Sequence, residues 1–287
     1  MSCRIIQSLA EISDAYDAVF CDLWGCYHNG LETYPAAVAA LQGFRARGGT
    51  VILLTNAPRP AASVKLYLDR MNAPLDSYDA IVSSGEACQA ALTSGRHGDG
   101  FFYVGPERDL HNLTDLGLAP VGLDQASAIL LTGLRDDQTE QLEDYTDELE
   151  QWRKRGLAVL CANPDIIVDR GEQRLWCAGA IAQMYERAGG EVLWFGKPHF
   201  PVYERCHEVL SDLTGREVAH ERILAVVDGI LTDVPGGLAA GLDTLFVTGG
   251  LSAMDFGADV EHPAQAPLDA FLRQQNLAPQ FAIGRLR

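Results

Sequence analysis

Short apolar runs alternate along the chain with longer segments of helical periodicity. Runs of this length, bounded by turn residues, are typical of strands that are buried on both faces of a sheet. Strand, loop and helix follow one another repeatedly, which predicts parallel strands joined by crossover helices and therefore an α/β fold. The predicted strands comprise residues 18–22, 51–54, 80–82, 101–104, 128–131, 157–161, 192–195, 223–227, 244–247 and 281–283.

The segments between these runs carry the helical pattern. The helix predicted at residues 36–47 ends at Gly48 and Gly49, and glycine is a common helix terminator. Residues 136–150 form a strongly acidic helical segment, which we interpret as a solvated outer face rather than a binding surface. Residues 166–176 are predicted as a short hairpin. Further helices are predicted at 61–71 and at 201–213. Two more are predicted, one directly after residues 83–86 and one that follows the hairpin and ends at residue 188.

The chain is long enough for more than one domain. Its 287 residues exceed the usual single domain of about 100 to 200 residues. The alternation of strands and helices continues through the middle of the chain but has the character of a different module. We therefore predict a discontinuous core domain of residues 1–83 and 189–287, which contains the strand at 192–195, around an inserted α/β domain of residues 84–188.

The composition is acidic, with 39 Asp and Glu against 22 Lys and Arg and a formal net charge of −17. Such a charge repels nucleic acid and anionic membranes, and we expect neither as a partner. The sequence has no uncharged apolar run of about 18 residues and no secretory pattern at its amino terminus, so we expect a cytoplasmic protein. An acidic protein that handles a phosphorylated anion needs a metal ion or well-placed cations in its site.

The seven cysteines form no Cys-x-x-Cys pair and are odd in number. This spacing does not favour a disulfide framework or a cysteine-based zinc site. We therefore expect reduced thiols that act mostly as small buried hydrophobic side chains.

Polar side chains follow four of the predicted strands. Because the carboxyl ends of parallel strands meet at one edge of a sheet, where ligands usually bind, these side chains are candidates for one site. Taken singly, each has a simpler explanation as a turn residue, a helix cap or a surface lysine. The side chains are those of Asp22, Thr55 and Asn56, Lys197, and Asp228 with Asp233.

The order of these groups resembles that of the haloacid dehalogenase-like hydrolases, and in particular class IIA, the NagD-like and pyridoxal phosphate phosphatase-like enzymes. The resemblance spans residues 16 to 248 and implies a Rossmann-like parallel-sheet core with an inserted α/β cap domain of the C2 type. Members of this group often pair through their caps, which makes a homodimer one candidate assembly. The matching phrases are Asp22-Leu23-Trp24-Gly25 with Gly30, Leu53-Leu54-Thr55-Asn56, Gly196-Lys197-Pro198, Asp228 to Asp233, and Asn163-Pro164-Asp165 in the insert.

The resemblance implies a Mg²⁺-dependent phosphatase that acts on a small phosphorylated metabolite, a sugar phosphate being one candidate. Asp22 would attack phosphorus and form an aspartyl-phosphate that water then hydrolyses. Mg²⁺ would be held by Asp22, the backbone carbonyl of Trp24 and Asp228, with Asp233 as a ligand or as a support for the ligands. A carboxylate that approaches a phosphate dianion is repelled, so the chemistry itself requires such compensation of charge.

The phosphate-binding groups implied by the resemblance are Thr55, Asn56 and Lys197. The Thr55 hydroxyl and the Asn56 backbone amide would hold phosphate oxygens, while Lys197 would neutralise charge between the phosphate and Asp22. Lys197, together with Mg²⁺, would supply the positive charge that an acidic protein needs in order to bind a phosphate.

One position departs from the family pattern. Phosphatases of this superfamily usually carry a second aspartate two residues after the nucleophile, where it protonates the leaving group, and here that position is Trp24. General acid–base help is worth about 10² to 10⁴ in rate. His28 in the same loop is the nearest substitute, with Tyr27 as a weaker one. If His28 has this role, replacing it by glutamine lowers turnover at least about tenfold with little change in stability.

Two alternatives follow from the same residues. The protein could be a phosphate-ligand binding or regulatory protein on this fold that lost efficient catalysis with the second aspartate. Carbon–phosphorus cleavage tolerates that loss but needs a lysine that forms a Schiff base, and Lys65 is the only lysine between the first two motifs and the insert.

Overall fold

The structure is a computed structural model that describes residues 3–98, 100–114, 117–170, 173–230, 232–250, 256–257 and 259–287. Contacts between residues divide the chain into two compact units. Unit 1 comprises Met1–Thr55, Lys65–Val82 and Tyr203–Arg287, and unit 2 comprises Asn56–Val64 and Ser83–Val202. The predicted insert of residues 84–188 falls entirely within unit 2.

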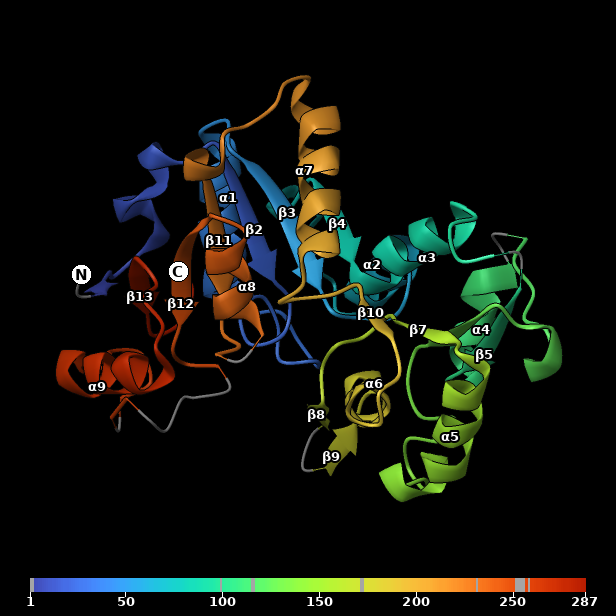
Figure 1. The fold of residues 1–287 in the computed structure, drawn as a ribbon. Helices are drawn as coiled ribbons and strands as arrows, with labels where there is room; N and C mark the ends of the chain where they lie inside the picture. Colours follow the sequence, from blue (N-terminus) through green and yellow to red (C-terminus); the bar gives the residue numbers. More distant parts are fainter. Residues whose placement is uncertain are drawn as a thin grey trace. The chain divides into compact units, whose positions relative to one another are not determined.

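Unit 1 is built on a sheet of seven strands in the order β1-β13-β12-β11-β2-β3-β4 (Figure 1). Strand β2 lies near the middle, pairs in parallel with β11 and β3, and is buried along its whole length, which explains its unbroken apolar run. The strands are β1 (Arg4–Ile5), β2 (Ala18–Asp22), β3 (Thr50–Thr55), β4 (Ala80–Ser83), β11 (Ile223–Val227), β12 (Asp243–Val247) and β13 (Phe281–Ile283).

Helices cover this sheet, as the crossover rule requires. Helix α1 begins with a proline in its first turn, packs on β3 and ends before Gly48, whose φ of +90° suits glycine. Helix α8 packs on β11 and β12 (Figure 1). The helices with residues in this unit are α1 (Pro35–Ala46), α2 (Ala61–Arg70), α7 (Phe200–Thr214), α8 (Asp233–Ala239) and α9 (Gln265–Gln275).

Unit 2 contains a parallel sheet of four strands in the order β10-β7-β6-β5 and a separate antiparallel hairpin of β8 and β9. Trp152, Tyr145 and Tyr185 fill the core between this sheet and its helices. The strands are β5 (Phe101–Val104), β6 (Ala128–Leu131), β7 (Ala158–Cys161), β8 (Ile167–Arg170), β9 (Gln173–Trp176) and β10 (Val192–Trp194). The helices are α3 (Ser84–Thr93), α4 (Glu107–Thr114), α5 (Thr146–Arg155) and α6 (Ala178–Arg187).

The predicted α/β class, the predicted strands and the hairpin are confirmed, but two expectations need correction. The strand predicted at 192–195 as part of the core instead comprises residues 192–194, pairs in parallel with β7 and completes the sheet of unit 2. The acidic segment 136–150 is not one helix, because the carboxylate of Asp136 accepts hydrogen bonds from the Gln138 amide and the Thr139 hydroxyl and holds a turn there. The regular helix α5 begins only at Thr146.

The seven cysteines, all at described positions, are buried and free of disulfides, as expected from their spacing. A helix that crosses a membrane needs about 20 mostly apolar residues. No helix within the described ranges combines that length with that apolarity.

Candidate active site

Asp22 and Asp228 meet at the carboxyl edge of the sheet in unit 1. Asp22 is the last residue of β2, and Asp228 directly follows β11. These strands are neighbours in parallel register, with Cys21 opposite Val226, so both carboxylates emerge at the same edge. They are 7% and 4% exposed. This burial and position match the site expected from the strand ends.

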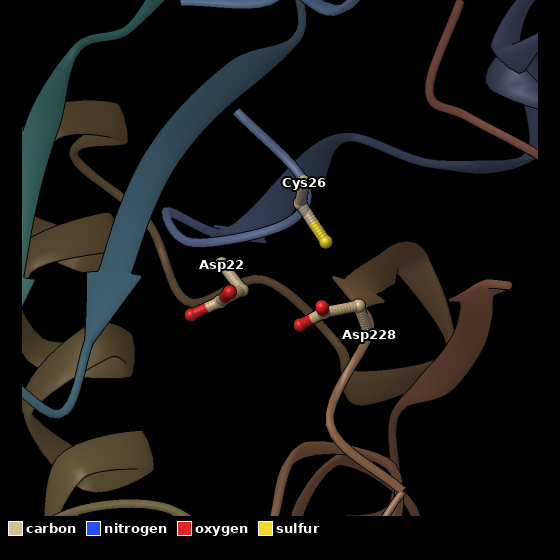
Figure 2. A group of neighbouring side chains, drawn as sticks. All are labelled: Asp22, Cys26 and Asp228. Carbon is tan, nitrogen blue, oxygen red and sulfur yellow. The ribbon is translucent and has the colours of Figure 1, made fainter. Parts of the chain in front are cut away.

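Cys26 is a third group in this site that the sequence analysis did not single out. Its thiol and the carboxylates of Asp22 and Asp228 lie with their ligand atoms within 4.8 Å of one another (Figure 2). Burial raises the pKa of the Cys26 thiol well above its usual value, and the Asp228 and Asp22 carboxylates add to the effect. A lone cysteine in a glycine-containing loop carried no metal-ligand spacing, so no sequence signal marked it.

The loop after β2 folds back on itself and positions Cys26. The backbone amides of Tyr27 and His28 both donate to the Leu23 carbonyl at 2.9 Å, and the Gly25 amide donates to the His28 carbonyl at 3.0 Å. The sharp return places the Cys26 sulfur so that it points toward the two carboxylates (Figure 2).

Two glycines form a close-fitting cradle around Asp228. A Cβ atom added at Gly25 or at Gly250 would lie 2.0 Å from Asp228 Oδ2. Gly25 also has a φ of +76°, which other residues rarely adopt. The carboxylate of Asp228 is therefore held in place by backbone on two sides.

Replacing Gly25 by alanine tests this cradle. The added methyl group pushes the Asp228 carboxylate away, so we expect loss of most activity that depends on Asp228, together with about 1 to 2 kcal/mol of backbone strain. Gly48→Ala is the matched control, because Gly48 has a φ of +90° and no heavy atom within 4 Å of an added Cβ. Thermal unfolding and phosphate release check the pair: both variants lose stability, and only Gly25→Ala loses activity. Equal activity in the two variants contradicts the role given to the cradle.

Asp233 lies close to Asp228 in the chain but has a different setting. It is the first residue of α8 and 5% exposed, and its Oδ2 accepts the Thr232 hydroxyl at 2.6 Å. Its carboxylate also lies against Gly229, where a Cβ would come within 2.3 Å of Oδ2. Asp233 is not among the three clustered groups found in the described residues, and its metal role stays a prediction.

Thr55 ends β3 at the same edge. In the pairing of β2 with β3, Asp22 lies opposite Leu54, so Thr55 is one residue beyond that level. Its side chain is 4% exposed. The sheet thus brings the Thr55 hydroxyl to the edge from which Asp22 emerges.

Asn56 and Lys197 are joined in unit 2. The Asn56 side chain accepts the Lys197 amide at 2.7 Å and donates to the Lys197 carbonyl at 3.0 Å and to Asp165 at 2.9 Å. Lys197 is 2% exposed, so the surface-lysine explanation is wrong. Asn56 does not cap a helix with these atoms, since its side chain is used to hold the Lys197 backbone.

The Gly196-Lys197-Pro198 and Asn163-Pro164-Asp165 phrases meet at this point. A Cβ at Gly196 would lie 2.5 Å from Asn56 Oδ1 and 2.6 Å from Pro164, so glycine is required for the approach. The peptide between Lys197 and Pro198 is cis. The motif of the insert therefore supports the lysine-bearing segment within unit 2.

Trp24 is 39% exposed and rests on its own loop. A Cβ at Gly30 would lie 2.3 Å from the far end of the indole, and the Tyr67 hydroxyl donates to the Gly30 carbonyl at 2.6 Å. A side chain at Gly30 would therefore displace the Trp24 indole from this position. The metal role of the Trp24 carbonyl stays a prediction.

His28 is packed inside the same loop rather than presented to solvent. It is 1% exposed, and its Nδ1 accepts the Gly30 amide at 3.0 Å. Its ring meets those of Trp24, Tyr27 and Tyr67 edge-on, with centroids 5.1, 6.5 and 6.0 Å away. Burial lowers the pKa of His28 to about 4, so the ring is neutral at pH 7. A neutral imidazole is a poor acid, and the arrangement favours a packing role.

His28→Gln separates these two roles. We expect the substitution to destabilise the protein by about 1 to 3 kcal/mol through lost ring packing. Turnover per folded molecule should change less than about threefold, since general acid–base loss costs far more. Thermal unfolding and steady-state rates measure both. A tenfold lower rate with unchanged unfolding temperature would instead establish His28 as the acid.

Lys65 does not have the environment of a Schiff-base lysine. Its Nζ is bound to both carboxylate oxygens of Asp69 at 2.9 Å, and this hydrogen bond raises the pKa of Lys65. A nucleophilic lysine needs a lowered pKa. Carbon–phosphorus cleavage by Lys65 is therefore not supported.

Comparison with known proteins agrees with this geometry. Family models described as haloacid dehalogenase-like hydrolase and HAD-hydrolase-like match residues 19–119 and 194–271. A solved haloacid dehalogenase-like hydrolase from Brucella suis 1330 is 38% identical with a TM-score of 0.84, and the match covers 99% of this chain and 100% of that one. The chain belongs to the haloacid dehalogenase-like hydrolases.

More distant relatives agree with the class IIA resemblance. The ribonucleotide monophosphatase NagD of Escherichia coli K12 is 23% identical over 239 residues, which cover 83% of this chain and 89% of the relative. A 4-nitrophenylphosphatase from Thermotoga maritima has the same fold, with a TM-score of 0.71, 22% identity and 95% of each chain covered. The recognition of a NagD-like member of the family from its motifs is thereby confirmed.

Proposed function

We propose that this hydrolase is a Mg²⁺-dependent phosphatase that acts on a small phosphorylated metabolite. The observation that carries the proposal is the pair of buried carboxylates, Asp22 and Asp228, at the carboxyl edge of the sheet. Carboxylate oxygens this close together are the ligands that a divalent cation such as Mg²⁺ prefers. The names of the relatives, a ribonucleotide monophosphatase and a 4-nitrophenylphosphatase, support phosphate monoesters as the substrate class.

Asp22 has the role of nucleophile in this proposal. A carboxylate oxygen of Asp22 attacks phosphorus while the bond from phosphorus to the leaving oxygen breaks, and that oxygen takes up a proton. Water then attacks the same phosphorus, the bond between phosphorus and Asp22 breaks, and inorganic phosphate leaves with the carboxylate restored. Burial suits this step because a poorly solvated carboxylate is more reactive toward phosphorus.

The donor set fits the ion, since Mg²⁺ prefers oxygen ligands and one or two carboxylates. Asp22, Asp228 and the Trp24 carbonyl would hold the ion, and Asp233 would bind it or hold the ligands in place. When bound, Mg²⁺ neutralises the carboxylates and the phosphate oxygens. Gly25 and Gly250 keep Asp228 in the position needed.

The phosphate would be bound by Thr55, Asn56 and Lys197. The Thr55 hydroxyl and the Asn56 backbone N–H would donate to phosphate oxygens, and the Lys197 ammonium would supply positive charge. The Asn56 side chain, which binds the Lys197 backbone on both its N–H and its C=O, fixes the lysine segment. The net charge of −17 disfavours a nucleic acid or an anionic membrane surface as the partner. A small anion can still bind where a local positive group such as Lys197 lies.

A phosphate-release screen tests the proposal. The purified protein with Mg²⁺ is assayed on an aryl phosphate and on a panel of sugar phosphates and nucleoside monophosphates, with a chelator-treated sample beside it. We expect release from at least one class, and none after chelation until Mg²⁺ is restored. No release from any phosphomonoester in the presence of Mg²⁺ contradicts the proposal.

A second candidate function is favoured by one observation. Trp24 replaces the usual proton donor, and His28 is packed and neutral, so no acid is evident in the loop. The protein would then be a phosphate-ligand binding or regulatory protein with weak hydrolysis. Ligand-dependent thermal stabilisation without phosphate release distinguishes this candidate from the phosphatase.

A further inference from the structure

The thiol of Cys26 changes what the carboxylate site can bind. Among the described residues, one group of three His, Cys, Asp or Glu side chains lies close enough together to share one ion. Its members are Asp22, Cys26 and Asp228. Mg²⁺ uses oxygen ligands and makes no use of a thiol. Thiolate sulfur, in contrast, favours softer ions such as Zn²⁺ and Cd²⁺.

The spacing of the three groups lets one ion reach all of them after a small adjustment. Zinc bonds are about 2.3 Å to sulfur and about 2.0 to 2.2 Å to carboxylate oxygen, so two ligand atoms of a tetrahedral zinc site lie about 3.3 to 3.7 Å apart. The three ligand atoms here lie within 4.8 Å of one another, so small side-chain rotations bring them to one ion. All three are less than 10% exposed, which shields the site from competing water.

We propose that Asp22, Cys26 and Asp228 form a site for a thiophilic divalent cation, Zn²⁺ or Cd²⁺, which occupies the place of Mg²⁺ and stops phosphate release. The inference rests on the proposed function in so far as the same two carboxylates hold Mg²⁺. Binding replaces the thiol proton: a sulfur–metal bond forms, the S–H bond breaks and one proton is released to solvent. No electron transfer and no further reactant are involved.

The loop geometry explains why Cys26 takes part. The two hydrogen bonds from the Tyr27 and His28 amides to the Leu23 carbonyl fix the backbone beside Cys26. The sulfur therefore points toward the carboxylates before any ion arrives (Figure 2). A preformed ligand set avoids the cost of ordering a flexible loop on binding.

Direct titration with Cd²⁺ tests the inference without any assay of turnover. Cadmium bound to a thiolate absorbs in the ultraviolet, so we expect a charge-transfer band that saturates at one ion per chain. Cys26→Ser keeps the size of the side chain but replaces sulfur by oxygen, and we expect it to abolish the band and to weaken Cd²⁺ binding at least about tenfold, given the preference of soft ions for sulfur. A band that persists in Cys26→Ser overturns the inference.

Cys21→Ser is the matched control. Cys21 is a buried thiol one residue before the nucleophile, and its Sγ lies 3.2 Å from the Asp22 carbonyl oxygen. It is not among the three clustered groups. We expect this variant to keep the band. Loss of the band in Cys21→Ser, or an equal loss in both serine variants, contradicts the assignment to Cys26.

A measurement on the unaltered protein covers the case in which Cys26→Ser does not fold. X-ray absorption at the zinc edge, with one equivalent of Zn²⁺, counts the sulfur ligands, and we expect one sulfur with oxygen neighbours. No sulfur ligand, or more than one, overturns the inference.

The outcome separates this inference from the proposed phosphatase. If Cd²⁺ binds through Cys26 but no phosphomonoester is hydrolysed, the ion site stands and the proposed function fails. If phosphate is released with Mg²⁺ but the Cd²⁺ band is absent, the proposed function stands and the inference fails. Where both hold, Zn²⁺ inhibits wild-type phosphate release and Mg²⁺ in excess restores it.

Discussion

We expect the replacement of Asp22 by asparagine to abolish phosphate release, by a factor on the order of 10⁴ or more, because the proposed nucleophile is lost. The amide has nearly the same shape as the carboxylate but cannot attack phosphorus. Because the change also removes one of two neighbouring buried negative charges, we expect the unfolding temperature to stay the same or rise. Phosphate release and thermal unfolding measure the two effects.

Asp17→Asn is the control for the Asp22 variant. Asp17 directly precedes the same strand β2 at its opposite end and pairs with Arg222 and Arg216. Hydrogen bonds from these guanidinium groups, Arg222 first, lower the pKa of Asp17. Its stabilising effect is therefore present above the usual carboxyl pKa and is lost as the pH falls through the lowered value. The variant should lose a little stability at pH 7 and keep phosphate release. If Asp22→Asn retains activity as Asp17→Asn does, Asp22 is not the nucleophile.

Replacing Trp24 by aspartate should raise turnover by about 100-fold, at the low end of what general acid catalysis provides. The new carboxylic acid stands two residues after Asp22, where the family's proton donor usually lies, and can protonate the leaving oxygen. The tryptophan is 39% exposed, so its removal opens no sealed cavity. The rate gain should be largest for substrates with poor leaving groups, which need the proton most.

Trp24→Asn is the matched variant for this experiment. Asparagine has the size of aspartate but no acidic proton, so it reports the effect of removing the indole alone. We expect its turnover to stay near that of the unaltered protein. Equal rates for the aspartate and asparagine variants would mean that this position does not supply the missing acid, and that the indole itself limits the reaction.

Much of the fold was predictable because it rests on local pattern. The strands at 101–104, 128–131, 223–227 and 281–283 were predicted with their observed limits, since a buried parallel strand must be apolar along its length. The carboxyl ends of such strands were predictable as well. A polar residue that ends or directly follows such a strand has to emerge at the edge of the sheet, as Asp22 and Asp228 do.

Other features depend on contacts between distant residues. Strand β10 carries the same apolar pattern whichever sheet it joins, and only its pairing with β7 places it in unit 2. The acidic segment shows how a local side-chain contact competes with a helix, since Asp136 holds a turn by accepting the Gln138 backbone amide and the Thr139 hydroxyl. A histidine has an ordinary pKa that suits acid–base chemistry, but burial among aromatic rings lowers the pKa of His28.

The sequence by itself determined the α/β class, the family, and the strand ends that carry Asp22, Thr55 and Asp228, because motif and hydrophobic period are local properties. Only the tertiary structure decided that Cys26 joins the two carboxylates and that Asn56 holds the Lys197 backbone. Both arrangements require the chain to fold back or to bring together residues far apart in sequence. Their energies come from burial and hydrogen bonding in the folded state, which leave no periodic trace in the chain.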